Sequence, residues 1–251
     1  MIRAVADALV SVFIAPGCAC CARTLEQPTR GAVCDACWAA IPLATDPVCE
    51  TCGDALPTWR RAGAPHGSLE IPGPTRSGLC ARCRRSARCI TIGRSIAPYE
   101  GALRNILHAL KYDRRRSLAA PLAALMVTRS GEVLTTADAV VPVPLHVFRR
   151  YRRGFNQAAE LSRHLGVPVL DCLRRTRSTV TQTDLPESRR HANVRGAFTL
   201  RRRIPAGSVL VVVDDVSTTG ATVDACATVL LEAGAREVRA LTAARAASRL
   251  P

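Results

Sequence analysis

Apolar and polar positions change their spacing several times along the chain, and one apolar run is distinctive. Residues 209–213 are five consecutive aliphatic residues, a pattern typical of a strand that is covered on both faces in a parallel sheet. Two acidic residues, Asp214 and Asp215, end this predicted strand, and we expect both side chains to face solvent or a ligand. A helix is predicted over residues 223–233, because Gly234 is a stop signal.

Strand-like and helix-like spacings alternate from about residue 93 onward. Helices are predicted over residues 102–112, 117–128 and 154–165, and strands over residues 139–143 and 238–242. This alternation predicts an α/β fold with a mostly parallel sheet flanked by helices. Because ligands bind at the carboxyl ends of the strands in such sheets, the acid pair that follows residue 213 is a candidate site.

The N-terminal residues carry a helical pattern of their own. Between Ile2 and Phe13 apolar residues recur three or four positions apart, which predicts an amphipathic helix that ends at Pro16. A signal peptide is disfavoured because Asp7 would lie within its apolar region. No apolar run reaches the roughly 18 residues that a membrane span requires. We therefore expect a cytoplasmic protein without a membrane span.

The chain contains 12 cysteines, and eight of them form four C-x-x-C pairs. Two such pairs can complete a tetrahedral shell of four thiolates around Zn²⁺. The predicted zinc ligands are Cys18, Cys21, Cys34, Cys37, Cys49, Cys52, Cys80 and Cys83. Four pairs imply two structural zinc ions, bound either by consecutive pairs or in an interleaved cross-brace. Among the other cysteines, Cys20 is an alternative ligand.

Disulfide bonds and redox chemistry fit the paired cysteines less well than zinc does. A disulfide framework is uncommon in a cytoplasmic protein, and four C-x-x-C copies are too many for one redox site. Proline and glycine are frequent between residues 53 and 79, which predicts a loop inserted in the second zinc module. We expect a first domain over residues 1–90, with the amphipathic helix and the cysteine pairs, and an α/β domain over residues 91–251.

A turn rich in hydroxyl groups connects the acid pair to the predicted helix. Its residues are Ser217, Thr218, Thr219, Gly220, Ala221 and Thr222. The N–H groups and the dipole at a helix N-terminus favour a phosphate, while adjacent carboxylates can accept hydrogen bonds from ribose hydroxyls. Each piece alone also fits a solvated strand end and a helix N-cap, but the whole segment favours a sugar-phosphate site. A P-loop pattern is absent.

Several segments, taken in order, resemble the ComF family of competence-associated, phosphoribosyltransferase-like proteins, including its GntX-type members. They are residues 110–112 (Leu-Lys-Tyr), 141–145 (Val-Pro-Val-Pro-Leu), 153–157 (Arg-Gly-Phe-Asn-Gln), the set Gln182, Arg189 and Asn193, and residues 214–222 (Asp-Asp-Val-Ser-Thr-Thr-Gly-Ala-Thr). The N-terminal cysteine pairs match as well. The resemblance implies a type I phosphoribosyltransferase fold with a small N-terminal cysteine-rich zinc-ribbon domain.

The resemblance also implies a reaction. In type I phosphoribosyltransferases a nucleophile displaces pyrophosphate from the anomeric carbon of phosphoribosyl pyrophosphate, whose diphosphate binds Mg²⁺. By this likeness Asp214 and Asp215 hold the ribose hydroxyls and orient water on Mg²⁺, and the turn of residues 217–222 holds the 5-phosphate. The acceptor of the phosphoribosyl group is not identified by any residue pattern.

Further residues are implied to serve the diphosphate. Pro142 and Val143 occupy the place of the pyrophosphate loop, although a plain strand exit accounts for them equally well. Arg153 and Arg189 are the nearest residues whose positive charge can pair with the diphosphate. Arg189 lies in a long segment that suits a catalytic hood, a mobile segment that closes over the reacting complex. Lys111 is the only lysine among 35 basic residues, which indicates that a compact ammonium is needed there, with chance as the alternative.

Positive charge is concentrated around these residues. The formal net charge is +15 at pH 7, and residues 140–205 contain 14 arginines against four acidic residues. One diphosphate pairs with only a few of these arginines, so the remaining positive charge is sufficient to bind nucleic acid as well. With 4% aromatic residues, DNA binding would rest on phosphate contacts and be salt-sensitive. The alternative to an enzyme is therefore a non-catalytic nucleotide- or single-stranded-DNA-binding accessory in DNA uptake, with DNA-uptake proteins as partners.

Overall fold

The computed structural model describes residues 7, 10, 15–44, 47–56, 78–147, 151, 153–177 and 194–246. Apart from Asp7 and Val10, the predicted N-terminal helix lies outside the described residues, and so does most of the proline- and glycine-rich stretch. Arg189 also falls outside them. Within the described part of the chain, no helix has the length and apolar character needed to cross a membrane.

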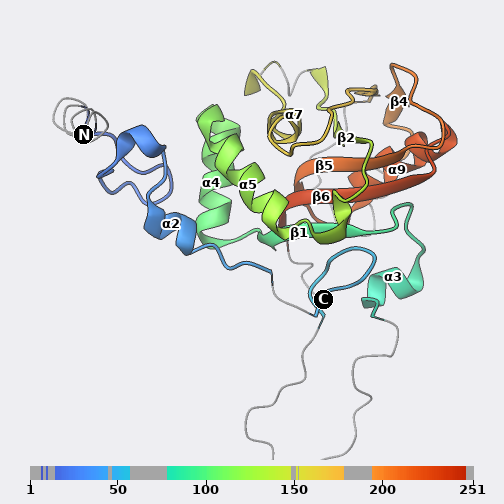
Figure 1. Ribbon diagram of the computed structural model, residues 1–251, viewed down its shortest axis with the longest axis horizontal. Coiled ribbons are helices and arrows are strands. Elements are labelled where there is room, and N and C mark those ends of the chain that lie inside the picture. The colour runs from blue at the N-terminus through green and yellow to red at the C-terminus, as the bar shows by residue number, and fades with distance from the viewer. Residues whose placement is uncertain are drawn as a thin grey trace, which may run out of the picture.

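Four parallel strands form the central sheet (Figure 1). In spatial order they are β1 (Gly93–Pro98), β6 (Glu237–Arg245), β5 (Val209–Ser217) and β2 (Ala139–Pro142). The aliphatic run of β5 is at most 1% exposed, as expected for an interior strand. A separate antiparallel pair joins β3 (Leu173–Arg175) to β4 (Phe198–Leu200). The prediction of an α/β fold with a mostly parallel sheet is confirmed.

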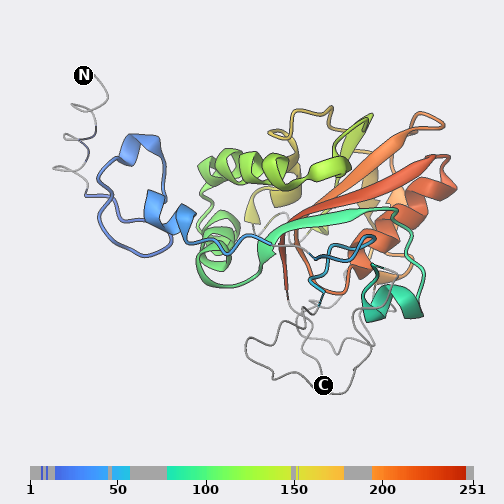
Figure 2. The ribbon, with the colours of Figure 1, turned by 60° about the horizontal axis from the view of Figure 1, so that its bottom comes forward.

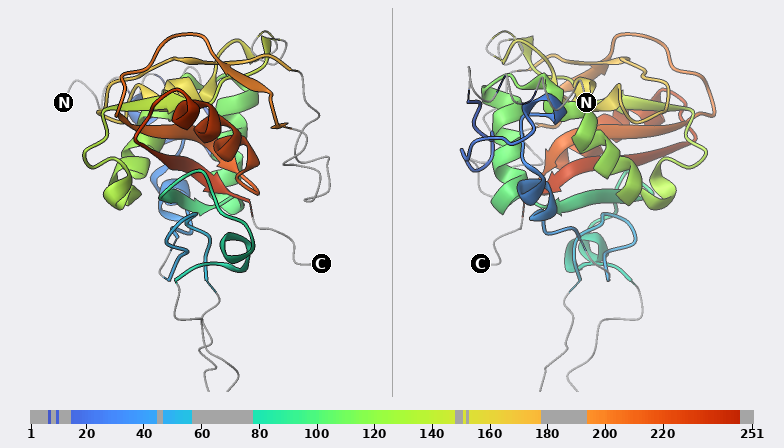
Figure 3. Two further views of the ribbon diagram at one scale, coloured as in Figure 1. Left: turned by 90° about the vertical axis from the view of Figure 1, so that its right-hand side faces the viewer. Right: turned by 60° about the vertical axis from the view of Figure 1, so that its left-hand side comes forward.

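Helices cover both faces of the sheet (Figures 2 and 3). On one face Val211 and Val213 share a core with α4 (Gly101–Tyr112), α5 (Ala119–Arg129) and α7 (Gln157–Ser162). On the other face Leu210 and Val212 share a core with α9 (Ala221–Glu232). Because successive strand side chains point to opposite faces, a strand between two helical layers needs an unbroken apolar run.

Three elements differ from their predicted bounds by three residues or more at one end. β5 continues through the acid pair to Ser217, because Asp214 and Val216 still pair with β6. β6 is longer than residues 238–242 for the same reason, since this pairing extends to both of its ends. The helix predicted over residues 154–165 is shorter, because the Asn156 side chain accepts a hydrogen bond from the Ala158 N–H and caps the first turn.

The cysteine-rich segments contribute two short helices, α2 (Asp35–Ala39) and α3 (Ala81–Arg85). α2 contacts α4, and Leu25, Val33 and Ile41 belong to the same apolar core as that helix. α3 lies at the other side of the molecule, near β1 and α9 (Figure 1). Single 3-10 turns are η1 (Pro28–Arg30), η2 (Arg116–Leu118) and η3 (Gly131–Val133).

Candidate functional site

The acid pair occupies the sixth and seventh of the nine residues of β5, beside the only lysine of the chain. Lys111, near the end of α4, places its Nζ 2.5 Å from Oδ2 of Asp215. The two side chains are 11% and 14% exposed, so the ion pair is mostly buried. The expectation that both carboxylates face solvent or ligand is therefore wrong for Asp215. Its Oδ2 faces an ammonium, because α4 packs over the sheet and brings Lys111 there.

The pKa values of Asp214 and Asp215 are shifted in opposite directions. Burial raises the pKa of Asp214 well above its ordinary range, and the neighbouring Asp215 carboxylate adds to this effect. Burial acts in the same direction on Asp215, but the Lys111 ammonium outweighs it and lowers the pKa of Asp215. Asp215 is thus the anionic member of the pair, and Asp214 takes up a proton more readily.

The turn after β5 has the form of a phosphate cradle. Gly220 is the N-cap of α9 and has φ 80°, a left-handed conformation that favours glycine. The Thr219 side chain is 1% exposed and its Oγ1 accepts a hydrogen bond from the Ala221 N–H. Thr218 and Thr222 are partly exposed. Thr219 therefore shapes the turn from inside.

Residues 142–145, which include the predicted pyrophosphate-loop residues, have few backbone N–H groups to offer a diphosphate. Pro142 ends β2 and, like Pro144, has no N–H group. The Val143 N–H donates to the Val213 carbonyl at 2.9 Å, and the Val143 carbonyl accepts from Asn156 Nδ2 at 2.9 Å. Within residues 142–145, Leu145 is the only residue with an N–H group that does not donate to β5 as the Val143 N–H does. Neither Pro142 nor Val143 thus has an N–H group left for a diphosphate in this conformation, and their assignment to a pyrophosphate loop stays a prediction.

Arg153 lies near the acid pair, and its role as a charge partner of the diphosphate stays a prediction. Its guanidinium lies 5.4 Å from the centre of the Tyr112 ring and donates to Gln157 Oε1 at 3.1 Å. Burial opposes the shift, and the positive charge of Arg153 adds to the larger effect of Lys111 in lowering the pKa of Asp215. Arg189, the predicted hood residue, lies outside the described residues, so its role stays a prediction.

A cleft of about 340 Å³ opens beside the Pro144 turn and the N-terminal end of α7. Its cationic lining residues are Arg116, Arg163, Arg174, Arg175 and Arg201. Part of this charge is neutralised locally, because Glu160 pairs with two of these arginines at 2.6 Å and Asp171 with another at 3.2 Å. The cleft still carries more cationic than anionic side chains, which suits a polyanionic ligand.

The eight paired cysteines form two groups in which all four sulfur atoms lie within 4.8 Å of one another. The first cluster is Cys18, Cys21, Cys34 and Cys37, and the second cluster is Cys49, Cys52, Cys80 and Cys83. Consecutive pairs thus come together, and the interleaved alternative is excluded. The Cys20 sulfur belongs to neither cluster and lies 3.7 Å from the Ala102 carbonyl oxygen, so Cys20 is not a substitute ligand.

Both clusters fit zinc. Tetrahedral thiolate coordination at about 2.3 Å separates the sulfurs by about 3.8 Å. The observed separations include 4.0 Å for Cys18 and Cys37, and 3.6 Å for Cys52 and Cys80. Although burial raises it, neighbouring backbone N–H donors lower the pKa of Cys18 to about 6, which favours the thiolate that zinc binds.

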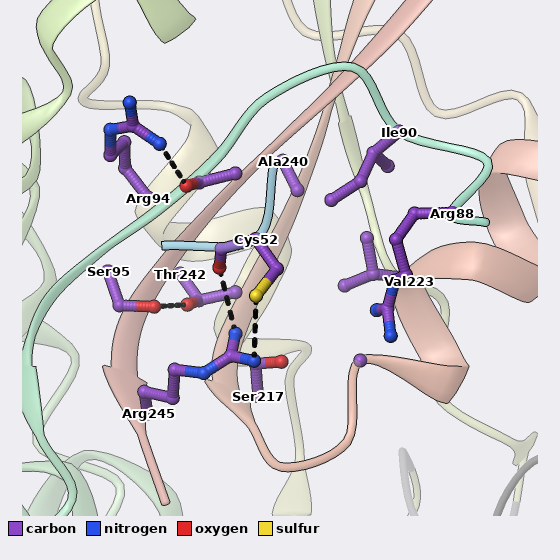
Figure 4. A pocket seen from close by; sticks show the side chains of 12 residues that line it. Cys52, Arg88, Ile90, Arg94, Ser95, Ser217, Val223, Ala240, Thr242 and Arg245 are labelled. Atoms are coloured by element: carbon purple, nitrogen blue, oxygen red, sulfur yellow. Dashed lines mark hydrogen bonds between the residues drawn. The ribbon is translucent and has the colours of Figure 1, made fainter. Parts of the chain in front are cut away.

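Sequence reasoning missed two arginines, of which Arg245 contacts Cys52 of the second cluster and Arg88 contacts the turn after β5. The Arg245 guanidinium is turned towards Cys52, and Arg88 lies at the start of α9 beside Val223 (Figure 4). No local signal distinguishes them, because 34 of the 35 basic residues are arginine and neither lies in a recognisable motif.

Comparison with known proteins agrees with this arrangement. Residues 126–251 match the phosphoribosyl transferase domain, and residues 9–70 match the double zinc ribbon domain. The DNA utilization protein YhgH of Salmonella typhi is 34% identical in an alignment of 221 residues, and the match covers 81% of this chain and 93% of the relative. Competence protein F of Haemophilus influenzae is 29% identical in an alignment of 226 residues, and the match covers 85% of this chain and 96% of the relative.

Among solved structures, glutamine phosphoribosylpyrophosphate amidotransferase from B. subtilis, complexed with ADP and GMP, is 24% identical. The match covers 53% of this chain and 30% of that chain, with a TM-score of 0.35. So low a TM-score carries no argument about function. The family matches, together with the parallel sheet and the two cysteine clusters, confirm the predicted fold class, a phosphoribosyltransferase-type domain with an N-terminal zinc ribbon.

Proposed function

The chain belongs to the ComF family, and we propose on that basis that it binds phosphoribosyl pyrophosphate with Mg²⁺ and transfers the phosphoribosyl group to an acceptor. One observation supports this most directly. The acid pair and the Gly220 turn follow one another within residues 214–222, at the carboxyl end of an interior parallel strand. Carboxylates for the ribose and a cradle for its phosphate therefore come from one continuous segment.

The residues of this site have different roles in the proposed reaction. The bond from the anomeric carbon to the diphosphate oxygen breaks while the acceptor forms its own bond to that carbon. The ribose must be held while positive charge develops on its ring. Asp215 is held by Lys111 and by the Val216 N–H, which donates to its Oδ1 at 2.9 Å, and Asp214 Oδ1 accepts from the Asp215 N–H at 2.9 Å. The remaining lone pairs of these carboxyl groups would accept hydrogen bonds from the ribose hydroxyls. The 5-phosphate is held at the start of α9, away from the breaking bond.

Mg²⁺ fits the charge of this site. Burial and Asp215 disfavour the ionised form of Asp214, and a cation nearby would favour it. Mg²⁺ takes oxygen ligands and usually keeps several waters. Asp214 would orient such a water, since Asp215 is already paired with Lys111. When bound, the ion neutralises charge on the departing diphosphate.

We expect ligand affinity and protein stability to respond in opposite directions to pH as Asp214 titrates. An acid with a raised native-state pKa stabilises the fold below its unfolded-state pKa, and this contribution is lost as pH rises through the native-state value. Mg²⁺-dependent affinity increases over the same interval, because the cation favours the carboxylate. Calorimetric titration and thermal unfolding in a pH series measure the two effects.

Asp214→Asn provides the control, because it removes the titrating group and keeps the shape of the side chain. It should flatten both profiles in the interval where the wild-type protein changes. An affinity profile that is identical in the wild-type and Asp214→Asn proteins would assign the titration to a different group.

A second candidate function is binding of single-stranded DNA without turnover. Two observations favour it: the arginine-lined cleft beside the Pro144 turn, and relatives named for DNA utilization and competence. Direct partners in DNA uptake are part of this proposal. The two functions share sugar-phosphate binding and differ in whether an acceptor receives the phosphoribosyl group.

Calorimetric titration with phosphoribosyl pyrophosphate and Mg²⁺ tests the proposed function. We expect it to bind more tightly than ribose 5-phosphate, because the diphosphate adds charge-assisted contacts. Single-stranded DNA titrated at several salt concentrations tests the alternative, for which the log–log slope should be about −0.7 per phosphate contacted. Tight, salt-sensitive DNA binding with no turnover across a panel of amines and bases would favour the accessory role. Failure of phosphoribosyl pyrophosphate to bind would reject the proposed function.

A further inference from the structure

The second cysteine cluster packs directly against β1 and β6, and β6 pairs with β5, the strand that leads into the phosphate cradle, defined here as residues 217–222. Gly53, which follows Cys52, has φ 71°, and a Cβ built there would lie 2.5 Å from the Gly93 carbonyl oxygen of β1. The cavity between cluster and sheet measures only about 10 Å³, room for about one water molecule. This interface is therefore close-packed, and a shift on one side must be transmitted to the other.

Arg245 connects the cluster to the first residue of the cradle. From the end of β6 its guanidinium pairs with Asp54 and donates to the Cys52 carbonyl at 3.0 Å, with Cys52 Sγ 3.6 Å away (Figure 4). Arg245 is also the strand partner of Ser217, and the next residue, Ala246, donates its N–H to the Ser217 carbonyl at 2.8 Å. The backbone at Ser217 is thus held by a residue that itself holds a zinc ligand.

Arg88 connects the same module to the other end of the cradle. It lies five residues after Cys83, and its side chain is 3% exposed. One guanidinium nitrogen donates to the Thr219 carbonyl at 2.9 Å, and another lies 3.0 Å from Asp224 in the first turn of α9. A Cβ built on Gly220 would lie 1.9 Å from this guanidinium, so glycine is required there for space as well as for its φ.

The first cluster has different neighbours. Cys20, between its first two ligands, places its sulfur against Ala102, and its carbonyl accepts from Asn105 Nδ2 at 3.3 Å. Both partners lie in the N-terminal half of α4, away from Lys111 at the other end of that helix. The two clusters are therefore alike in chemistry but contact different parts of the α/β unit.

We propose that the second cysteine cluster, through Arg245 and Arg88, positions the phosphate cradle, so that affinity for a sugar phosphate depends on zinc in this cluster but not in the first. The ligand in this statement rests on the proposed function. The two arginines are positioning residues, because Arg245 contacts the backbone at Ser217 through its strand pairing, and Arg88 contacts the Thr219 carbonyl and the first turn of α9. Zinc binding by the second cluster would thereby change the affinity of the cradle for a sugar phosphate, although the zinc ion does not contact that ligand.

Cys83→Ser and Cys37→Ser form a matched pair for the test. Each cysteine lies in a short helix after another ligand cysteine, and they are 8% and 9% exposed. The probe is ribose 5-phosphate, titrated by calorimetry into the full-length protein. We expect Cys83→Ser to weaken binding at least about tenfold, within the usual range of coupling between sites, and Cys37→Ser to change it less than about twofold.

Arg245→Ala leaves all eight zinc-binding cysteines in place, so it tests the proposal even if Cys83→Ser does not fold. It should retain its zinc by elemental analysis, weaken ribose 5-phosphate about tenfold, and speed amide hydrogen exchange in residues 217–222, with partial rescue by Arg245→Lys. Arg239→Ala is the control, because Arg239 is a 12%-exposed, ion-paired arginine on the same strand that contacts residues 132–135 instead. It should leave both readouts unchanged.

The outcomes separate this proposal from the proposed function. If the wild-type protein binds ribose 5-phosphate and Arg245→Ala changes neither affinity nor exchange, the coupling is rejected and the function stands. If the wild-type protein does not bind, the function fails, and faster exchange in Arg245→Ala but not in Arg239→Ala still supports the coupling. Equal effects of both arginine variants would show a general loss of stability and reject a positioning role.

Discussion

Replacement of Asp214 and Asp215 together by asparagine is expected to abolish measurable binding of phosphoribosyl pyrophosphate. Hydrogen bonds to a charged group contribute about 1.5–3 kcal/mol each, so loss of two carboxylates weakens binding by at least about a hundredfold. Isothermal calorimetry with Mg²⁺ measures this loss directly. Unchanged affinity in the double variant would mean that the segment no longer binds a sugar phosphate.

The same double variant also loses stability, because the Lys111 ammonium keeps its mostly buried position without its partner. Removing one member of a buried ion pair costs about 3–5 kcal/mol, and this pair lies near the lower limit because both side chains retain some exposure. Adding Lys111→Met should restore much of the melting temperature and none of the affinity. Recovery of binding in that triple variant would show that the carboxylates act only through stability.

Zinc removal is expected to have the second large effect. The protein prepared without chelator should contain about two equivalents of zinc, since each cluster supplies a complete four-thiolate shell. Structural zinc contributes about 10–16 kcal/mol of apparent binding free energy, so a chelator should unfold residues 18–56 and 78–90. The sheet should persist, because the core on its α9 face contains none of the eight ligands.

Elemental analysis and hydrogen exchange before and after chelation check this expectation. Exchange should become fast around both clusters and stay slow in Val209 to Val213, which are at most 1% exposed. Less than one zinc per chain would contradict the cluster assignment. A single cooperative loss of all slow exchange would instead mean that the cysteine-rich segments and the sheet fold as one unit.

Local pattern was sufficient for features whose physical cause is local. Five aliphatic residues in succession are typical of a strand that is buried on both faces, so residues 209–213 predicted a parallel sheet. Two cysteines three positions apart present both sulfurs to one ion, so the eight zinc ligands were evident. The left-handed Gly220 at the start of α9 follows from a turn that only glycine enters readily.

Tertiary structure alone decided which of these features meet. Which cysteine pairs share an ion depends on how the chain returns after residues 57–77, and the sequence allowed two groupings. The ion pair of Lys111 with Asp215 joins residues 104 positions apart, and Arg245 reaches Asp54 from 191 positions away. Such contacts depend on how α4 and the second cluster pack on the sheet. Local periodicity has no access to that packing, whereas burial and charge pairing across the sheet determine it.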